Sequence, residues 1–335
     1  MKGVMNRSNM SRNEMMMRRL GQLAREHATD EGRSLEELKK TKEILKGAES
    51  QRLRRFCTSE RMVPGRDLDE LGKAILMGDF DYVSLDFSRR IAEQMMTLGR
   101  EKAFSAAAEQ YYNLRWGPTE TPIYNLLGLA MQLVPSQKEA HFQLARLFIK
   151  AKVPVDGTDL SGTTALSHCF STKPSFELEY AQLLYDAGGD VNHRNRYGGI
   201  VAEEIIKIYD HHDREVVRKA TAALEWFLNH GGNVDIADGD GYTPRDMCKR
   251  LAGRVPALLS LVEKEDEKRK AKGNSCCSLC GRDEEKLLTC GKCKKAKYCA
   301  PSSRACQKLD WPKHKKECKA SGIVILCDFQ ASFHI

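Results

Sequence analysis

The chain has 335 residues, enough for about two domains, with 41% hydrophobic and 30% charged residues. This is an ordinary soluble composition, and no run approaches the ~20 apolar residues of a membrane-spanning helix. Net charge is +7 over residues 1–66, −6 over 67–262 and +8 over 263–319. Basic ends favour contacts with nucleic acid or acidic proteins, and solvated helix faces are the alternative.

Residues 1–66 are predicted to form a basic helical or disordered arm. No apolar stretch with a cleavage site follows the first methionine, so we expect no secretory signal and an intracellular protein, in nucleus or cytoplasm. A mitochondrial presequence is the alternative, because the segment is rich in Arg and Met. Ser34 and Glu37 have capping-box spacing and predict a helix running to about residue 56. Its apolar content is thin, which favours a solvated arm.

Residues 67–265 are predicted to be helical. Spaced aliphatic residues precede Gly78-Asp79, a pattern common in helical repeats. Further amphipathic helices are expected over 91–110, 121–133 and 138–150, with prolines marking the breaks between them.

Three similar segments follow, each with a Val, then Asp or Asn, a short loop containing Gly, and a new helix. The valines are Val155, Val191 and Val234, and the loop glycines are Gly162, Gly198 and Gly241. Gly-Gly pairs precede the second and third segments, where a glycine can end a helix in the left-handed conformation. A glycine in the loop permits a tight turn.

These segments resemble ankyrin repeats, and Thr243-Pro244 is similar to the helix start of that family. The loop glycines are 36 and 43 residues apart, against a family period of about 33. The extra length is expected near 171–176 and 209–214. We predict three repeats, clearest over 155–255, and a fourth upstream with helices at 121–133 and 138–150. A generic helical solenoid is the alternative, and either architecture would bind another protein, through the turn tips and the concave helix face.

The charged run at 263–272 is either the end of the last repeat helix or a linker, and we expect the domain boundary near residue 273. Beyond it the cysteines become dense: eight of the chain's twelve lie between Cys276 and Cys318. In a chain without a signal peptide, such clustering indicates metal rather than disulfides.

The spacing of these residues predicts two zinc ions. Two Cys-x2-Cys pairs and a His-x3-Cys pair, together with two further cysteines, give eight ligands and two closed four-coordinate sites, which are structural rather than catalytic. Redox or disulfide chemistry is the alternative. The ligands are Cys277, Cys280, Cys290, Cys293, Cys299, Cys306, His314 and Cys318.

The order of these residues, with Tyr-Cys, Cys-Gln and Asp-Trp pairs among them, resembles the MYND finger over residues 276–318. The resemblance implies a cross-braced pattern, in which Cys277, Cys280, Cys299 and Cys306 hold one zinc and Cys290, Cys293, His314 and Cys318 hold the other. Cys276 also neighbours a ligand, but only Cys277 has the two-residue spacing to Cys280.

One departure from the family lies between Cys299 and Cys306, where six residues replace the usual three. Deleting residues 300–302 would restore the family spacing. Either the loop bulges and still brings Cys306 to the metal, or the three residues come from a shifted splice site.

The resemblance further implies a groove for a proline-containing peptide, lined by Gln307 and Trp311. An indole offers a flat apolar wall for a proline ring; simple packing of Trp311 inside the finger is the alternative. Basic residues on the finger favour an acidic partner. The spacing of a ββα nucleic-acid finger is missing. The basic residues are Lys292, Lys294, Lys295, Lys297, Lys313, Lys315 and Lys316.

No enzyme is predicted, and we assign no catalytic residue. MYND fingers also occur beside SET methyltransferase and oxygenase domains, but SET signatures are not found. His211-His212-Asp213 contains the His-x-Asp of an iron oxygenase, and we interpret it as a polar loop between repeat helices. No nucleophile elbow, P-loop or dinucleotide fingerprint is found. The tail at 319–335 is apolar, and its role stays open.

The sequence therefore predicts a mainly α fold, an ankyrin-like helical solenoid followed by a small two-zinc MYND finger. The expected function is that of a protein-interaction adaptor, with transcriptional regulation suggested by analogy alone, and with neither a membrane nor a small-molecule substrate. A chromatin-associated factor that uses its basic ends on nucleic acid is the alternative, which steep salt dependence of DNA binding would favour.

Overall fold

The computed structural model describes residues 32–60, 62–171, 176–208, 210–283, 286–299 and 304–319. By its internal contacts the chain divides into two compact units. The first comprises the residues up to 209 together with 237–244, and the second comprises 210–236 together with the residues from 245 onward. The apolar tail beyond residue 319 and the segment 300–302 lie outside the described residues.

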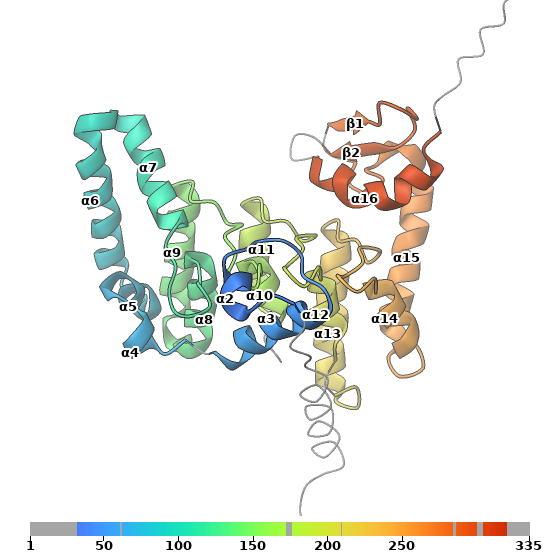
Figure 1. Ribbon diagram of the computed structural model, residues 1–335, viewed down its shortest axis with the longest axis horizontal. Helices are drawn as coiled ribbons and strands as arrows, with labels where there is room; N and C mark the ends of the chain where they lie inside the picture. The colour runs from blue at the N-terminus through green and yellow to red at the C-terminus, as the bar shows by residue number, and fades with distance from the viewer. Residues whose placement is uncertain are drawn as a thin grey trace, which may run out of the picture. The chain divides into compact units, whose positions relative to one another are not determined.

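The first unit contains a series of antiparallel helices (Figure 1): α4 (Pro64–Asp67), α5 (Glu70–Met77), α6 (Phe80–Leu98), α7 (Arg100–Tyr112), α8 (Ile123–Leu133), η1 (Pro135–Gln137) and α9 (Lys138–Lys150). A single helix over 91–110 was the wrong expectation, because Gly99 has φ 74° and separates α6 from α7. Tyr111 of α7 is fully buried, donates to Asp86 of α6 over 2.9 Å, and contacts the ring of Phe87. These contacts hold the α6–α7 hairpin together.

Three loops of the first unit share one hydrogen-bonding pattern. Asp159, Asn195 and Asp238 each accept, through Oδ1, the backbone amides two and four residues ahead, at 2.9–3.1 Å. Three residues after each comes the loop glycine, in the left-handed region at φ 75°, 77° and 92°. This turn, repeated three times, is the local basis of the ankyrin-like repeat.

A fourth loop lies upstream at 116–121, where Trp116 and Thr121 pair as an antiparallel bridge. Glu120, with φ 53°, stands where the other loops have glycine. Each loop also bonds to the next: Leu160 N to Thr119 O at 2.8 Å, Arg196 N to Ser161 O at 2.8 Å, and Gly239 N to Tyr197 O at 3.0 Å. Helices α8 and α9 follow this loop, as expected for the helices of the upstream repeat at 121–133 and 138–150.

Helices α10 (Ala165–Ser171) and α11 (Leu178–Asp186) follow and pack as a pair. Helix α12 (Val201–Ile206) is the last helix of the first unit, and α13 (Arg214–Asn229) belongs to the second. Helices α10 and α12 pack against each other inside the first unit. The extra length expected near 171–176 and 209–214 lies partly outside the described residues.

The N-terminal segment differs from the expected solvated arm. The capping box at Ser34 and Glu37 forms, but the helix that it starts, α2 (Leu35–Lys39), is short, and α3 (Gly47–Ser59) follows after a break. Leu38, Leu45 and Leu53 are at most 2% exposed and pack with Leu160 and Tyr197 of the repeat loops.

Arg196 explains both the break between α2 and α3 and the packing of this N-terminal segment on the repeat loops. Its buried guanidinium donates to Leu38 O at 2.7 Å, and its carbonyl accepts the Leu45 amide at 2.7 Å. Backbone groups that would continue a helix instead bond to a repeat loop. We call α2, α3 and their connection, residues 34–59, the strap; it covers the loop tips around Leu160 and Tyr197.

The second unit contains α13, α14 (Pro244–Leu251), α15 (Pro256–Lys272), η2 (Gly273–Ser275), strands β1 (Leu287–Thr289) and β2 (Lys297–Cys299), and α16 (Arg304–Glu317). Helices α13 and α15 pack against each other, and Leu224 and Phe227 of α13 and Leu258 and Val262 of α15 are buried. The charged run 263–272 is the end of α15 rather than a linker. Arg245 joins Asp235 and Asp266 at 2.6 Å each and ties the start of α14 to α15.

Candidate metal centres

A short antiparallel hairpin and one helix build the finger. Strands β1 and β2 pair with Leu287 opposite Cys299 and Thr289 opposite Lys297. The register places Cys290, which follows β1, and Cys299, which ends β2, at opposite ends of the hairpin. Helix α16 carries Cys306 and His314, and Cys318 follows one turn after His314.

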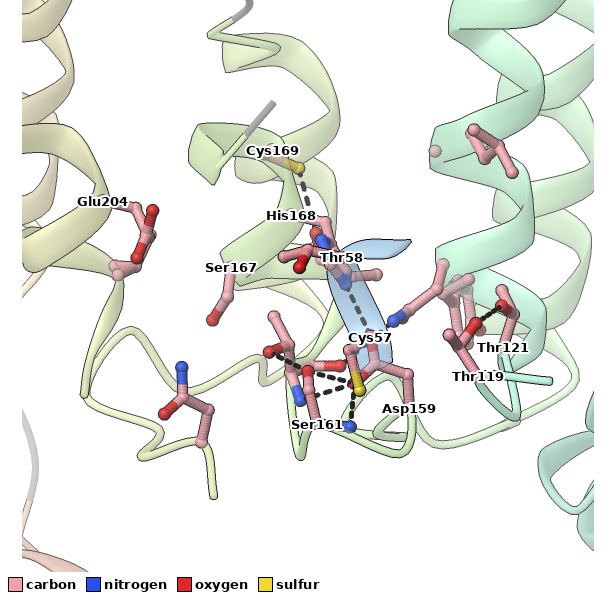
Figure 2. A pocket seen from close by; sticks show the side chains of 18 of the residues that line it. Cys57, Thr58, Thr119, Thr121, Asp159, Ser161, Ser167, His168, Cys169 and Glu204 are labelled. Atoms are coloured by element: carbon pink, nitrogen blue, oxygen red, sulfur yellow. Dashed lines mark hydrogen bonds and ion pairs between the residues drawn. The ribbon is translucent and has the colours of Figure 1, made fainter. Parts of the chain in front are cut away.

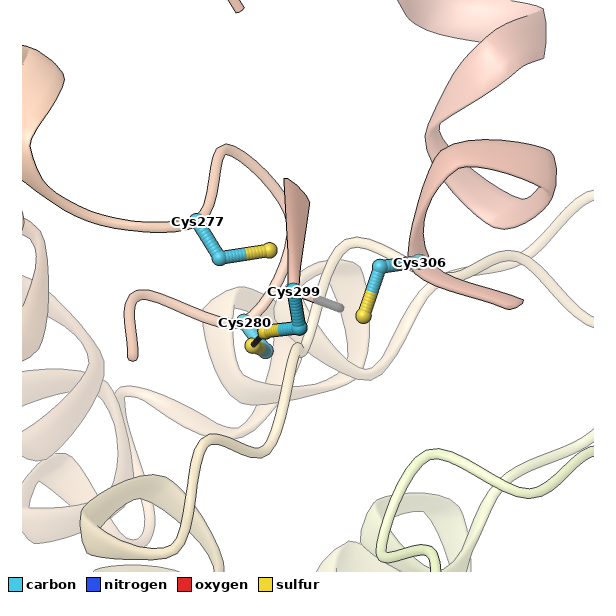
Figure 3. A group of neighbouring side chains, drawn as sticks. All are labelled: Cys277, Cys280, Cys299 and Cys306. Carbon is cyan, nitrogen blue, oxygen red and sulfur yellow. Dashed lines mark hydrogen bonds between the residues drawn. The ribbon is translucent and has the colours of Figure 1, made fainter. Parts of the chain in front are cut away.

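The first cluster consists of Cys277, Cys280, Cys299 and Cys306, whose sulfur atoms all lie within 4.8 Å of one another. Figure 3 shows the four side chains converging from the knuckle, the end of β2 and the start of α16. The Cys280 and Cys299 sulfurs are 3.4 Å apart, close to the ~3.8 Å edge of a tetrahedron with Zn–S bonds of about 2.3 Å. Cys306 reaches this cluster despite the six residues that separate it from Cys299.

The second cluster consists of Cys290, Cys293, His314 and Cys318, again with all ligand atoms within 4.8 Å. His314 Nε2 lies 3.4 Å from Cys290 Sγ and 3.6 Å from Cys293 Sγ, and the Cys290 and Cys318 sulfurs are 3.9 Å apart. The eight residues thus assemble in the cross-braced arrangement, and the two clusters fit two zinc ions. Cys276 belongs to neither cluster; its sulfur faces the Gly273 carbonyl.

The local electrostatics favours the thiolate of one cysteine in each cluster, whereas the pKa values of Cys280, Cys299, Cys306 and Cys318 are raised. Hydrogen bonds from Cys280 and Cys306 lower the pKa of the Cys277 thiol. The Cys293 amide, and after it His314, lower the pKa of Cys290 to about 6. Zinc binds the thiolate form, so each cluster has a ligand that needs little proton release. Four protein ligands complete each tetrahedron, and a closed site of this kind supports the fold.

The predicted groove residues lie on α16 beside the second cluster. Trp311 is 43% exposed, and its ring centroid is 6.0 Å from that of His314. Gln307 is half-buried one turn earlier. Tyr298 of β2 donates to Asp310 at 2.6 Å and fixes α16 against the hairpin. The indole is therefore partly open to solvent on a helix anchored by two zinc ligands.

The first knuckle is also bonded to the last repeat helices, which the sequence analysis missed. The Leu279 carbonyl, between Cys277 and Cys280, accepts from Asn233 at 2.9 Å and from Arg269 of α15 at 3.0 Å. Arg269 also donates to the Gly232 carbonyl at 2.8 Å, and Arg282 donates to the His230 carbonyl at 3.2 Å. The only sequence signal was the charged run at 263–272, and the sequence alone does not show which residues its side chains contact.

His211-His212-Asp213 lies between α12 and α13, as predicted for a polar loop. The Asp213 carboxylate accepts the amides of Glu215 and Val216 and caps α13. This use of the carboxylate explains the residue without a metal.

Comparison with known proteins agrees with the geometry of the finger. Residues 277–318 match the family model of the MYND finger. Histone-lysine N-methyltransferase SMYD3 of Homo sapiens is 51% identical over 43 residues, 13% of this chain and 9% of that protein. SET domain and MYND-type zinc finger protein 6 of Schizosaccharomyces pombe is 50% identical over 44 residues, 13% and 8% of the two chains. The chain spans about a tenth of the length of the curated relatives it matches.

Among solved structures, an ankyrin repeat domain from Acinetobacter baumannii aligns with a TM-score of 0.39 at 18% identity, over 58% of this chain and 97% of that domain. By its three repeat loops and its two ligand clusters, the chain combines an ankyrin-like helical region with a MYND finger. Among the described helices, none has both the length and the apolarity needed to cross a membrane.

Proposed function

We propose that this protein is an intracellular adaptor, whose ankyrin-like repeats bind a partner protein and whose MYND finger binds a proline-containing peptide. The observation that carries the peptide proposal is the 43% exposure of Trp311 on a zinc-anchored helix. A large aromatic side chain in a small domain would normally be buried, since its burial contributes most of the apolar area available. An exposed, positioned indole suits stacking on a proline ring.

The positive charge of the finger surface favours some peptides over others. Lys313, Lys315 and Lys316 are exposed on α16, and Lys292, Lys294 and Lys295 follow or lie within the second knuckle. Such a surface speeds the encounter with an acidic peptide and disfavours a basic one. We therefore propose a partner peptide in which acidic residues flank the proline.

We propose that the protein acts without catalysis. Both metal centres are closed, and the methyltransferases that it resembles match it only over the finger. Transcriptional regulation, in the nucleus or the cytoplasm, is the setting that we infer by analogy. Nucleic acid is the less favoured partner, because Arg33 pairs with Glu43 and Glu49 and Arg54 lies over the Tyr197 ring.

Calorimetric titration of the zinc-loaded full chain tests the finger. The probe is an 11-residue peptide with two prolines at its centre and glutamates at both flanks, and the control peptide has alanine for each proline. We expect the proline peptide to bind at least tenfold more tightly, and Trp311→Ala to lose this difference. Tyr242→Ala removes another exposed aromatic, 51% exposed in a repeat loop, and should leave binding unchanged. Equal binding of both peptides would overturn the proposal for the finger.

A further inference from the structure

The strap covers the tips of three successive repeat loops. Its buried leucines pack with Leu160 of the first loop and Tyr197 of the second. It also reaches the third loop, where the Gly47 amide donates to the Asp240 carboxylate at 3.4 Å. A partner protein that binds these loop tips must therefore displace the strap.

Arg196 lies beneath the strap as a buried charge, with 5% of its surface exposed. Its Nη1 donates to the Leu160 carbonyl at 3.2 Å, within the repeats. Its Nη2 donates to the strap, to the Leu38 carbonyl at 2.7 Å and to the Thr41 hydroxyl at 2.9 Å. All three acceptors are uncharged, and Nε has no hydrogen-bond partner among the described residues. The guanidinium is thus buried against neutral groups.

Burial of an arginine without a bonded carboxylate costs free energy, because the cation loses its hydration. Burial accordingly lowers the pKa of Arg196 from its usual value, and Glu43 is the acid that most opposes this effect. The Glu43 carboxylate, however, pairs with Arg33. The covered state of the loops therefore has an electrostatic cost that a ligand with its own carboxylate would avoid.

The guanidinium edge that the strap covers has the geometry for such a ligand. Nε and Nη2 of an arginine point in the same direction and form a fork that binds both oxygens of one carboxylate. In Arg196, Nη1 is held by the Leu160 carbonyl and stays held when the strap leaves, whereas Nη2 is released. Because this edge is buried in the covered state, a carboxylate can reach it only after the strap has moved.

The strap is also packed incompletely on the repeats. A cavity of about 450 Å³ has both α3 and the first repeat loop in its lining. Figure 2 shows Cys57 and Thr58 of α3 around the same space as Asp159 and Ser161 of that loop. Helix α2 has only five residues, too few for a stable isolated helix. A segment with few buried side chains opens locally at a low free-energy cost. The buried residues of the strap are Leu38, Leu45, Ser50 and Leu53.

We propose that the repeat loops beneath the strap bind a leucine-containing segment of a partner protein that brings a carboxylate to Arg196, and that the strap blocks this surface until the partner displaces it. The leucines of the partner take the place of the strap leucines on Leu160 and Tyr197. Its carboxylate supplies the charge that the strap lacks. The inference rests on the proposed binding of a partner by the repeats and deepens it, because it names the surface and the chemistry of the segment.

The first experiment tests the missing carboxylate in the full chain. Thr41→Asp introduces a carboxylate where the Thr41 hydroxyl contacts Nη2, and Thr41→Asn is the uncharged control of similar shape. Hydrogen exchange of the Leu45 amide, which bonds to the Arg196 carbonyl, reports the opening of the strap. We expect exchange about tenfold slower in Thr41→Asp than in Thr41→Asn, and no such difference when Arg196→Gln is added. The same two changes at Lys42, which is exposed, should give equal rates.

The second experiment tests whether the strap blocks the surface. Fluorescence anisotropy measures binding of a peptide with the sequence of residues 34–56 and the change Thr41→Asp to the full chain. Leu45→Ser weakens the strap of the protein, and Ile44→Ser, on a side chain 37% exposed, is the matched control. We expect Leu45→Ser to bind the peptide at least tenfold more tightly than wild type or Ile44→Ser does. Leu38→Ser should act alike and carries the test if Leu45→Ser does not melt as a folded protein.

Binding that is equal in wild type and in the weakened-strap variants, or absent from all of them, overturns the inference. So does a peptide with Thr41→Asn that binds Leu45→Ser as tightly as the Thr41→Asp peptide, or equal exchange of the Leu45 amide in the first experiment. Neither experiment uses a proline-containing peptide, and binding of that peptide to the wild-type finger is measured separately. This inference and the finger proposal can therefore fail independently.

Discussion

The repeat loops and the zinc knuckles are both short segments without a large core, and different forces hold them. In the loops, one oxygen of Asp159, Asn195 or Asp238 binds two amides, and each loop bonds to its neighbour. In the finger, four ligands converge on each metal position. Support in the loops is therefore spread over many weak bonds, whereas in the finger the loss of one ion removes four attachments together.

The two regions also differ in how they treat buried negative charge. The finger buries cysteine sulfurs, and a zinc ion balances their thiolate charge. In the repeats, Glu203 of α12 is 6% exposed and folds over Gly199, and its Oε1 has no hydrogen-bond partner among the described residues. Lys207 approaches only to 3.7 Å. The negative charge of the Glu203 carboxylate therefore has no close partner. The stability of the fold around Glu203 should depend on pH, whereas that of the repeat loops should not.

Removal of zinc should have the largest effect and should separate the two regions. Structural zinc contributes about 10–16 kcal/mol of apparent binding free energy in small zinc domains. We expect native mass spectrometry to show two zinc ions before chelation and none after it. Hydrogen exchange should then become fast over 276–318 and unchanged in the loops at 158–164 and 194–200. Rapid exchange in those loops as well would contradict the separation. A single zinc ion before chelation would show that one cluster does not close.

Much of both regions could be predicted from the sequence, because their signals are local. The ligand spacing is set by a knuckle turn or one helical turn, so Cys290, Cys293, His314 and Cys318 could be recognised without a fold. The loop glycines are equally local, since only a positive φ closes these turns. The upstream loop has Glu120 in place of the glycine. The sequence therefore predicted the upstream repeat only from the two helices that follow this loop.

The rest could not be predicted, because it depends on pairs far apart in the chain. Arg196 holds the strap through Leu38 and Leu45, more than 150 residues away. Nothing local distinguishes this arginine from a surface one, and the strap has the composition of a solvated helix. The bond from Asn233 to Leu279 is hidden in the same way. From its composition the strap was therefore expected to be exposed to solvent, although contacts with distant residues bury it.

The second-largest expected effect is the pH dependence of folding stability that Glu203 causes. Burial raises the pKa of Glu203 from 4.5 to about 7. Below pH 4.5 the carboxyl is protonated in both folded and unfolded chains. As pH rises to 7, the unfolded chain loses the proton first, so the folded state is destabilised, by up to about 3 kcal/mol at 1.36 kcal/mol per pKa unit.

The measurement compares wild type with Glu203→Gln by hydrogen exchange of the α12 amides between pH 5 and 8, corrected for intrinsic exchange rates. The advantage of the glutamine variant should grow with pH and level off above 7. Glu204→Gln is the matched control, because its side chain is 29% exposed and pairs with Lys207. A constant difference between wild type and Glu203→Gln across this range would show that Glu203 is ionised throughout.

The smallest effect tests whether the finger is attached to the last repeat or only follows it. Arg269→Ala removes donors to the carbonyls of Leu279 and Gly232, and two buried acceptors lose a partner at about 1–3 kcal/mol in total. We expect faster exchange in α13, α15 and the first knuckle, with the zinc count unchanged at two. Lys268→Ala, on a side chain 50% exposed, should stay within about 0.5 kcal/mol of wild type. If both variants behave alike, the finger is held by its metals alone, and zinc loss would then leave α13 and α15 intact.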